Sequence, residues 1–214
     1  MTARCELSMN GMRGQITSLD ETKLLPNEWP HKWDKPIVTY RLNNFTNDWE
    51  KKKHQERAVS VAFRTWQERV KDVKFKRVYD SFTPVDIPID FKPLSAFGGR
   101  RGVLADAVYP GQIETSPIRI NDDWDWVPHA NWQNIGHPPL LAVLIHEIGH
   151  ALGLKHDTRT MDSIMYPSFD LGVPKNNLHE YDIARIQDKY GKRTVSQRFL
   201  DVMKRRRLDG TDFR

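Results

Sequence analysis

The sequence predicts one α+β domain, in which short strands come first along the chain and helices dominate its second half. Five short segments are rich in β-branched and aromatic residues and are separated by Pro, Gly and Ser clusters, at residues 36–42, 73–78, 85–91, 103–109 and 117–121. Two helical segments follow, near 138–152 and 177–191. This order favours α+β over a doubly wound sheet, and 214 residues suit one domain with appendages.

A long amphipathic helix is expected directly after the first strand. The strand PIVTYRL begins with Pro36, whose missing N–H is tolerated at a first strand position. Asn47 with Glu50 three residues later makes a capping-box pattern. Apolar residues then recur at helical spacing to about Arg69, which predicts a buried face on this helix.

The two later helices have predicted start and stop residues. Pro139 suits the first turn of a helix that contains LLAVLIHEIGHAL, and Gly153 is placed to end it. The last helix is expected to begin at Asn177, with Glu180 as its capping partner, and to stop at Gly191.

The net positive charge lies at the C-terminus. Lys and Arg number 33 against 28 Asp and Glu, an excess of five. Residues 192–214 carry eight basic and three acidic side chains, which equals the whole excess, so residues 1–191 are formally neutral. We therefore divide the chain into an irregular lead-in (1–30), a domain (31–191) and a basic tail (192–214). A solvated tail is favoured, with contact to an anionic partner as the alternative.

Neither a membrane span nor a secretion signal is visible in the sequence. There is no run of about 18 apolar residues, and the first 25 residues contain no apolar core. A single cysteine, Cys5, excludes an intramolecular disulfide framework. The compartment stays open on these grounds.

Residues 146–156, HEIGHALGLKH, have the spacing of a catalytic zinc site. His146 and His150 are four apart on a predicted helix, so both imidazoles lie on one face. Gly153 lets the chain turn back and bring His156 in as a third nitrogen ligand. Three imidazoles leave one open position on a tetrahedral zinc for water. Glu147 is then the candidate general base that takes the proton of the attacking water and delivers it to the leaving amine.

This pattern resembles the metzincin metalloendopeptidases, whose motif H-E-x-x-H-x-x-G-x-x-H is followed by a turn containing Met. Residues 163–167, SIMYP, supply such a turn, in which Met165 is expected to be a structural floor beneath the zinc. Within the metzincins the chain is most similar to the matrixins, the catalytic domains of matrix metalloproteinases, over about residues 31–191. Further matching segments are TYRL at 39–42, AFRTW at 62–66 and LADA at 104–107.

The resemblance implies a zincin-like fold: a twisted mixed sheet of about five strands, three helices, and an active-site cleft between the sheet edge and the Met-turn. It also implies an extended substrate, antiparallel to the edge strand, whose S1′ side chain enters a pocket made roomy by a small residue at Ala142. The implied substrate-binding residues are Val103, Leu104, Ala105, Ala142, Tyr166, Pro167 and Phe169.

Several residues depart from the matrixin pattern. Asp157 follows the third His, where matrixins usually have Ser or Thr and adamalysins have Asp. Adamalysins carry several cysteines and this chain has one, so the resemblance to matrixins is the better one. Asp106 and Arg119 stand where two His ligands of the family's second, structural zinc are expected, so we expect that site to be missing. The glycine-rich calcium loop is replaced by residues 97–102, FGGRRG.

Calcium is therefore a doubtful cofactor in this chain. The acidic loop that follows residues 117–121 offers hard oxygen ligands, and a solvated loop is the favoured alternative. Its members are Asn121, Asp122, Asp123 and Asp125.

Latency is a further implication of the resemblance. Cys5 follows Arg4, and matrixin pro-segments use an Arg-Cys pair whose thiolate occupies the fourth zinc position. About 30 residues are too few for the family's helical propeptide, so a free terminal thiol is the favoured alternative.

The predicted function is that of a zinc-dependent endopeptidase acting on proteins or peptides as a monomer, with one catalytic zinc. Family members usually act outside cells. The alternative is a non-catalytic zinc-containing protein that holds a partner in the groove or with the basic tail. Glu147 weighs against it, because a metal site without catalysis has no need of a base that is not a ligand. Nucleic-acid binding through the tail is a third hypothesis and predicts steep salt dependence.

Overall fold

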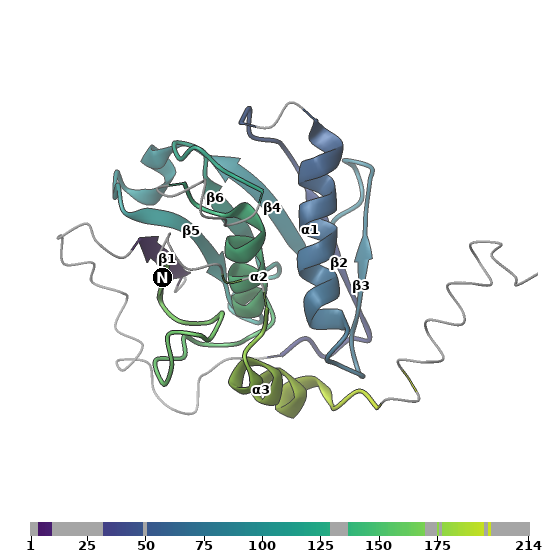
Figure 1. Ribbon diagram of the computed structural model, residues 1–214. Helices are drawn as coiled ribbons and strands as arrows, with labels where there is room; N and C mark the ends of the chain where they lie inside the picture. Colours follow the sequence, from purple (N-terminus) through teal and green to yellow (C-terminus); the bar gives the residue numbers. More distant parts are fainter. Residues whose placement is uncertain are drawn as a thin grey trace, which may run out of the picture.

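The computed structural model describes residues 4–9, 32–48, 51–128, 137–169, 175, 177–194 and 197. They form one mixed sheet with α1 and α2 side by side on one of its faces and α3 across the lower end of the molecule (Figure 1). The strands are β1 (Arg4–Met9), β2 (Ile37–Leu42), β3 (Lys74–Arg77), β4 (Ile87–Lys92), β5 (Val103–Val108), β6 (Ile118–Asn121) and β7 (Ser168–Phe169). The helices are α1 (Lys52–Gln67), the short 3-10 helix η2 (Leu94–Phe97), α2 (Leu140–Ala151) and α3 (Glu180–Tyr190).

The predicted α+β fold with a mixed sheet is confirmed. The strand order is β3-β2-β4-β6-β5-β1-β7. β2, β3, β4 and β6 pair in parallel, and β5 runs antiparallel to β6. These five strands lie where the five β-rich segments of the sequence predict them, and the three α-helices of the described part match the three predicted ones.

Strand β1 differs from the sequence expectation. Residues 1–30 were expected to be an irregular lead-in, yet Arg4–Met9 form a strand that pairs antiparallel with β5 and in parallel with β7. β5 would otherwise end the sheet with unpaired N–H and C=O groups, which an extended segment can satisfy. The pairing is a tertiary contact across about a hundred residues, so no local pattern in residues 1–30 predicts it.

The core lies between the sheet and the pair of helices. α1 buries Val59, Ala62, Phe63 and Trp66, as its predicted apolar face requires. Trp66 also donates a 2.9 Å hydrogen bond from Nε1 to the Ile145 carbonyl, which joins α1 to α2. Every residue of α2 is buried, because α1 and the sheet enclose it.

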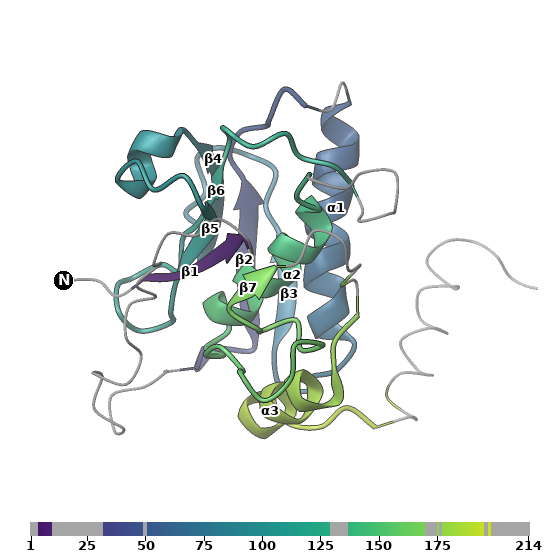
Figure 2. The same cartoon turned by 60° about the vertical axis from the view of Figure 1, so that its left-hand side comes forward.

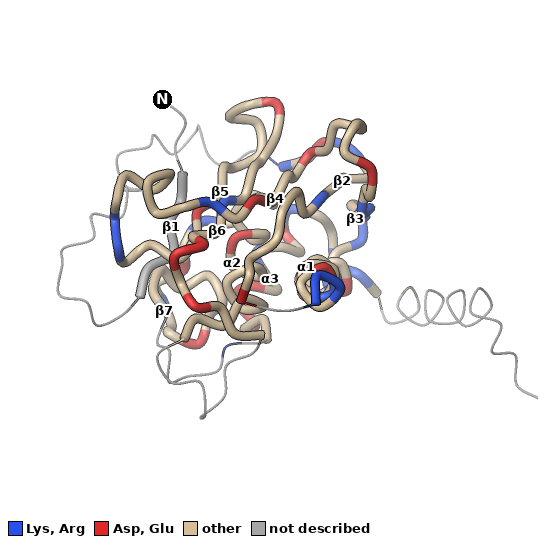
Figure 3. The backbone as a smooth tube through the Cα atoms, turned by 90° about the horizontal axis from the view of Figure 1, so that it is seen from above, with Lys and Arg blue, Asp and Glu red and all other residues tan. Residues whose placement is uncertain are grey.

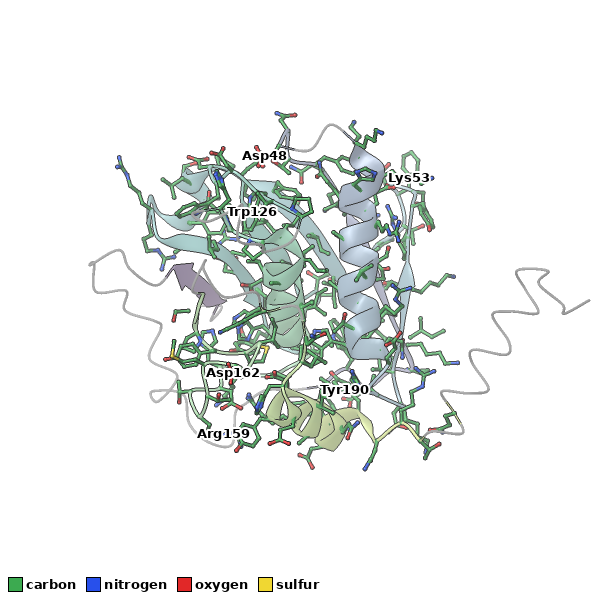
Figure 4. All side chains as sticks on the ribbon, in the orientation of Figure 1. Asp48, Lys53, Trp126, Arg159, Asp162 and Tyr190 are labelled. Carbon is green, nitrogen blue, oxygen red and sulfur yellow. The ribbon has the colours of Figure 1, made fainter. Side chains whose placement is uncertain are left out.

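Two helix starts differ from the capping patterns. α1 begins at Lys52 and not near Asn47, with no side-chain cap at Lys51. Nearby Asp48 instead accepts a 2.9 Å hydrogen bond from the backbone N–H of Trp126, and the two residues lie near each other above α2 (Figure 4). α3 begins at Glu180 and not at Asn177, because His179 and Asp182 form its capping box.

The predicted helix stops hold, and the lower end of the molecule is tied together by aromatic side chains. Gly153 and Gly191 have positive φ values of 88° and 71°, which glycine adopts without the steric cost of a side chain. Tyr190 is the last residue of α3 and is labelled in Figure 4. Its hydroxyl donates a 2.9 Å hydrogen bond to the carbonyl of Leu152, directly after α2. Trp33 donates from Nε1 to the Ala151 carbonyl at 2.9 Å, so the chain before β2 is fixed to the same end.

Charges of both signs are interspersed over the described part of the chain (Figure 3). This agrees with the formal neutrality of residues 1–191. None of the described helices has both the length and the apolar character that a membrane crossing requires. Most of the basic tail, residues 192–214, lies outside the described residues.

Candidate metal centre

Three histidines converge at the C-terminal half of α2. His146 and His150 are one turn apart, and their Nε2 atoms lie 2.9 Å from each other. The positive φ of Gly153 turns the chain back after α2, and His156 joins the pair. One ligand atom from each of the three residues lies within 4.8 Å of the others. The spacing in the sequence therefore corresponds to one cluster in space.

Backbone carbonyls orient the two helical imidazoles. Nδ1 of His146 lies 2.6 Å from the carbonyl oxygen of Ile164, and Nδ1 of His150 lies 2.7 Å from that of Leu154. A carbonyl oxygen only accepts, so each Nδ1 carries the proton and donates. Each Nε2 is then left with a lone pair that points into the cluster, the tautomer that a metal ligand needs.

The environment of these imidazoles suits a metal cation. Burial lowers the pKa of both His146 and His150 well below its usual value, and the neighbouring histidines lower it further. Both rings are therefore neutral at pH 7, and metal binding displaces no proton from them. Two neutral imidazoles with facing Nε2 lone pairs repel each other unless a cation lies between them. Three imidazole nitrogens are a donor set that fits zinc.

Glu147 is fully buried beside the cluster. It follows His146 directly on α2, and its solvent exposure is 0%. A buried carboxylate next to a set of metal ligands is placed to accept a proton near the metal.

The Met-turn packs against the same helix. Met165 is fully buried, and the backbone N–H of Asp157 donates a 2.8 Å hydrogen bond to its carbonyl. A Cβ added to Gly149 of α2 would lie 2.4 Å from the Met165 sulfur, so the side chain contacts the helix between the two histidines. Met165 therefore packs against α2 at Gly149, the residue before His150.

Asp182 of α3 holds the Met-turn in place and was not identified as a site residue from the sequence. Its carboxylate accepts hydrogen bonds from the Ser163 hydroxyl at 2.6 Å and from the Ile164 N–H at 2.9 Å. Ile164 is the residue whose carbonyl orients His146. In the sequence, Asp182 and Ile183 match the last helix of the matrixins, which indicates an element and not a role.

Asp157 fixes the loop that carries His156. Its carboxylate pairs with the guanidinium of Arg159, with 2.9 Å between Nε and Oδ1, and lies 3.5 Å from that of Arg185 on α3. The Arg159 hydrogen bonds lower the pKa of Asp157 to about 2. Arg159 and Asp162 lie beside α3 in Figure 4, on the segment between the third histidine and Met165. This Asp, a departure from the matrixin pattern, thus ties the ligand loop to α3.

Strand β1 lies between β5 and β7 at one end of the strand order (Figure 2). The register pairs Leu7 with Ala105 and Met9 with Phe169. Val103, Leu104 and Ala105 are buried, and Ala142 is fully buried in the hydrophobic core. Of the chain that follows Met165, Tyr166 and Pro167 are half-buried. The residues predicted to bind substrate thus lie on β5, on α2 and on the chain after Met165, and their role stays a prediction.

The three histidines are the only group of three or more His, Cys, Asp or Glu side chains in the described residues whose ligand atoms come this close. Asp122, Asp123 and Asp125 form no such group, and Asp123 accepts a 3.1 Å hydrogen bond from the Leu94 N–H. At the implied second zinc site, Asp106 and Arg119 form an ion pair, which does not fit a metal.

Comparison with known proteins agrees with this geometry. The sequence model of the matrixin family matches residues 32–191. This chain belongs to the matrixin family. The chain is 35% identical to matrix metalloproteinase-18 of Xenopus laevis over 164 residues, 75% of the chain and 33% of that protein. It is 33% identical to horse (Equus caballus) stromelysin-1 over 168 residues, 75% of the chain and 33% of that protein.

Cat (Felis catus) matrilysin is 33% identical over 181 residues, 81% of the chain and 65% of that protein. The matched part of the chain thus spans about a third of two of these relatives and under two thirds of the third. Matrixins are zinc metalloendopeptidases, and the histidine cluster is where this chain offers ligands for that zinc.

Proposed function

We propose that this matrixin hydrolyses peptide bonds of protein substrates, with His146, His150 and His156 as zinc ligands and Glu147 as the general base. The observation that carries the proposal is the pair of facing Nε2 atoms, 2.9 Å apart, whose rings are oriented by backbone carbonyls beside a buried carboxylate. A site that only held a structural metal would have no chemical use for that carboxylate.

Each residue has a defined part in the proposed reaction. Zinc bound by the three imidazoles supplies a Lewis acid that polarises the scissile carbonyl and acidifies water. The Glu147 carboxylate accepts the proton of the attacking water and returns it to the nitrogen of the leaving amine. The carbonyls of Ile164 and Leu154 keep the His146 and His150 rings in the ligand tautomer throughout.

The proposed substrate binds as an extended strand between β5 and β7, antiparallel to β5. Residues 4–9 of the chain itself support this mode of binding, because they run antiparallel to β5 and pair with both β5 and β7. The groove can therefore accept an extended backbone, with Val103, Leu104 and Ala105 supplying main-chain hydrogen bonds. We propose Ala142, Tyr166, Pro167 and Phe169 as the residues around the first side chain after the scissile bond.

The test is cleavage of a quenched Pro-Leu-Gly-Leu peptide and of an unfolded protein by the purified, zinc-loaded chain. Glu147→Gln should retain one zinc per chain and lose cleavage by about a thousandfold. The matched control is Glu180→Gln, which changes an exposed glutamate of α3 and should cleave like wild type. A chelator should abolish cleavage by wild type.

A protein that binds zinc but cuts neither substrate, even without residues 1–30, would favour the non-catalytic alternative. Binding of a peptide that survives in Glu147→Gln would then locate the partner in the groove. Binding that depends steeply on salt would instead assign it to the basic tail.

A further inference from the structure

A buried ion pair lies on the face of the sheet that is opposite to α2. Asp106 of β5 has a solvent exposure of 0% and lies directly across from Arg119 of β6. Arg119 donates from Nε to Asp106 Oδ1 at 2.8 Å and from Nη2 to Oδ2. Both carboxylate oxygens are thus bound by one guanidinium, the bidentate arrangement that fixes the geometry of a pair most tightly.

The same guanidinium also contacts the segment that leads into β5. Arg119 Nη1 donates a 2.8 Å hydrogen bond to the carbonyl of Ala96 in η2. The guanidinium lies 5.0 Å from the ring centroid of Phe97, which is itself 1% exposed. One side chain of β6 therefore joins β5, β6 and η2.

This pair is an uncommon choice for the strand that borders the groove. Ala105 and Ala107, which flank Asp106 on β5, belong to the hydrophobic core, whereas Asp106 binds Arg119, whose guanidinium also contacts η2. A buried carboxylate is costly unless its partner stays in place, so loss of either partner leaves a buried charge unpaired. The position of β5 and the position of η2 are therefore coupled through Arg119.

We propose that Asp106 and Arg119 are positioning residues for the substrate groove: their ion pair holds η2 against the sheet and keeps the β5 backbone in register. The inference rests on the proposed function for its effect on substrate. Its structural part stands independently, because it concerns the order of residues 94–108. The ion pair stands at two of the positions where the family resemblance implies ligands of a second zinc.

The test compares amide hydrogen exchange of the full zinc-loaded chain and its variants. Asp106→Leu combined with Arg119→Met removes both charges at similar volume, which favours a folded protein. Exchange in residues 94–108 should rise about tenfold, while α1 stays unchanged. Arg119→Lys should restore part of the protection. The matched control is Arg41→Met, because Arg41 of β2 likewise donates to two loop carbonyls, those of Asp80 and Thr83, elsewhere in the sheet.

Unchanged exchange in residues 94–108 of the double variant, or an equal rise there in Arg41→Met, overturns the proposal. A second zinc per chain that disappears in the double variant also overturns it. If wild type cleaves peptide, the double variant should raise KM about tenfold and leave kcat within about twofold. If wild type cleaves nothing, the proposed function fails, and hydrogen exchange still decides the inference.

Discussion

The carboxylate of Asp182 accepts a 2.6 Å hydrogen bond from the hydroxyl of Ser163, and this contact joins α3 to the Met-turn. The same carboxylate accepts from the N–H groups of Ile164 and His179, both at 2.9 Å. It therefore caps α3 and fixes the Met-turn at once. Because the Ile164 carbonyl orients His146, the last helix also influences the metal centre.

Asp182→Ala should lower the free energy of unfolding by about 3 kcal/mol, because it leaves buried donors of the Met-turn without an acceptor. It should also weaken zinc binding, since His146 loses its fixed orientation. Urea unfolding and zinc titration measure the two effects. Asp188→Ala, an exposed aspartate of the same helix, is the control and should change stability by under about 0.5 kcal/mol. Equal losses in the two variants would contradict the assigned role.

Gly149→Ala should destabilise the protein, although Ala is usually the better helix residue. The added Cβ would lie 2.4 Å from the Met165 sulfur and 3.0 Å from Cζ2 of Trp66. Both side chains are fully buried, so the overlap should cost about 1–2 kcal/mol net in thermal unfolding. In a Met165→Ala background the same change should be neutral or stabilising. A cost that persists in that background would show that Met165 is not the obstacle.

Asp157 should contribute stability that is lost in acid. Its folded pKa of about 2 is below the usual 3.8, so the ionised form is favoured by folding. The contribution is present above pH 3.8 and disappears as the pH falls through about 2. Asp157→Asn should therefore be less stable than wild type by about 1 kcal/mol at pH 5, after allowance for the exposed Arg159.

The difference between Asp157→Asn and wild type should narrow towards pH 2 in metal-free protein, as followed by urea unfolding. Asp162→Asn, in the same segment and exposed, is the matched control and should leave stability at pH 5 within about 0.5 kcal/mol of wild type. A constant difference between Asp157→Asn and wild type across this range would remove the ion pair as its cause.

The zinc helix was predictable because every requirement is local in the sequence. Two histidines four apart, a glycine that can adopt a positive φ and a third histidine fix one cluster by helix geometry alone. The five strands were predictable for the same reason, since β-branched runs between turn residues define them. The mixed direction of the sheet came from the family resemblance, whereas the strand order is known only from the structure.

The features that were missed depend on contacts between distant parts of the chain. The capping patterns at Asn47 and Asn177 are of a kind that is also common in loops. In the structure α3 is capped by His179 with Asp182, and α1 has no side-chain cap. Asp106 and Arg119 were noticed as departures from a metal site, but their pairing follows from the register of β5 with β6. Strand β1 is the largest such difference. Its pairing depends on β5, which would otherwise be left with an unpaired edge and lies about a hundred residues away in the sequence.

Strand β1 should compete with substrate for the groove. It lies antiparallel to β5 and parallel to β7, the place and direction proposed for a bound peptide. When a site is free only part of the time, its apparent affinity falls by the free fraction. A variant lacking residues 1–30 should therefore cleave peptide with a kcat/KM about 10–100 times that of the full chain, mainly through a lower KM.

Proline substitutions test the same competition without shortening the chain. Along a strand, the N–H groups of successive residues point alternately to the strand on one side and to the strand on the other. Proline has no N–H, so either Glu6→Pro or Leu7→Pro removes a hydrogen-bond donor that is directed at β5. That variant should cleave peptide with a higher kcat/KM than the full chain. Two controls should leave kcat/KM unchanged: Gln15→Pro, which lies outside the strand, and removal of residues 195–214. A peptide comprising residues 1–10 should inhibit the truncated enzyme competitively. If neither truncation nor either proline raises kcat/KM, β1 does not occupy the groove during turnover, and strand addition at β5 is not what limits substrate binding.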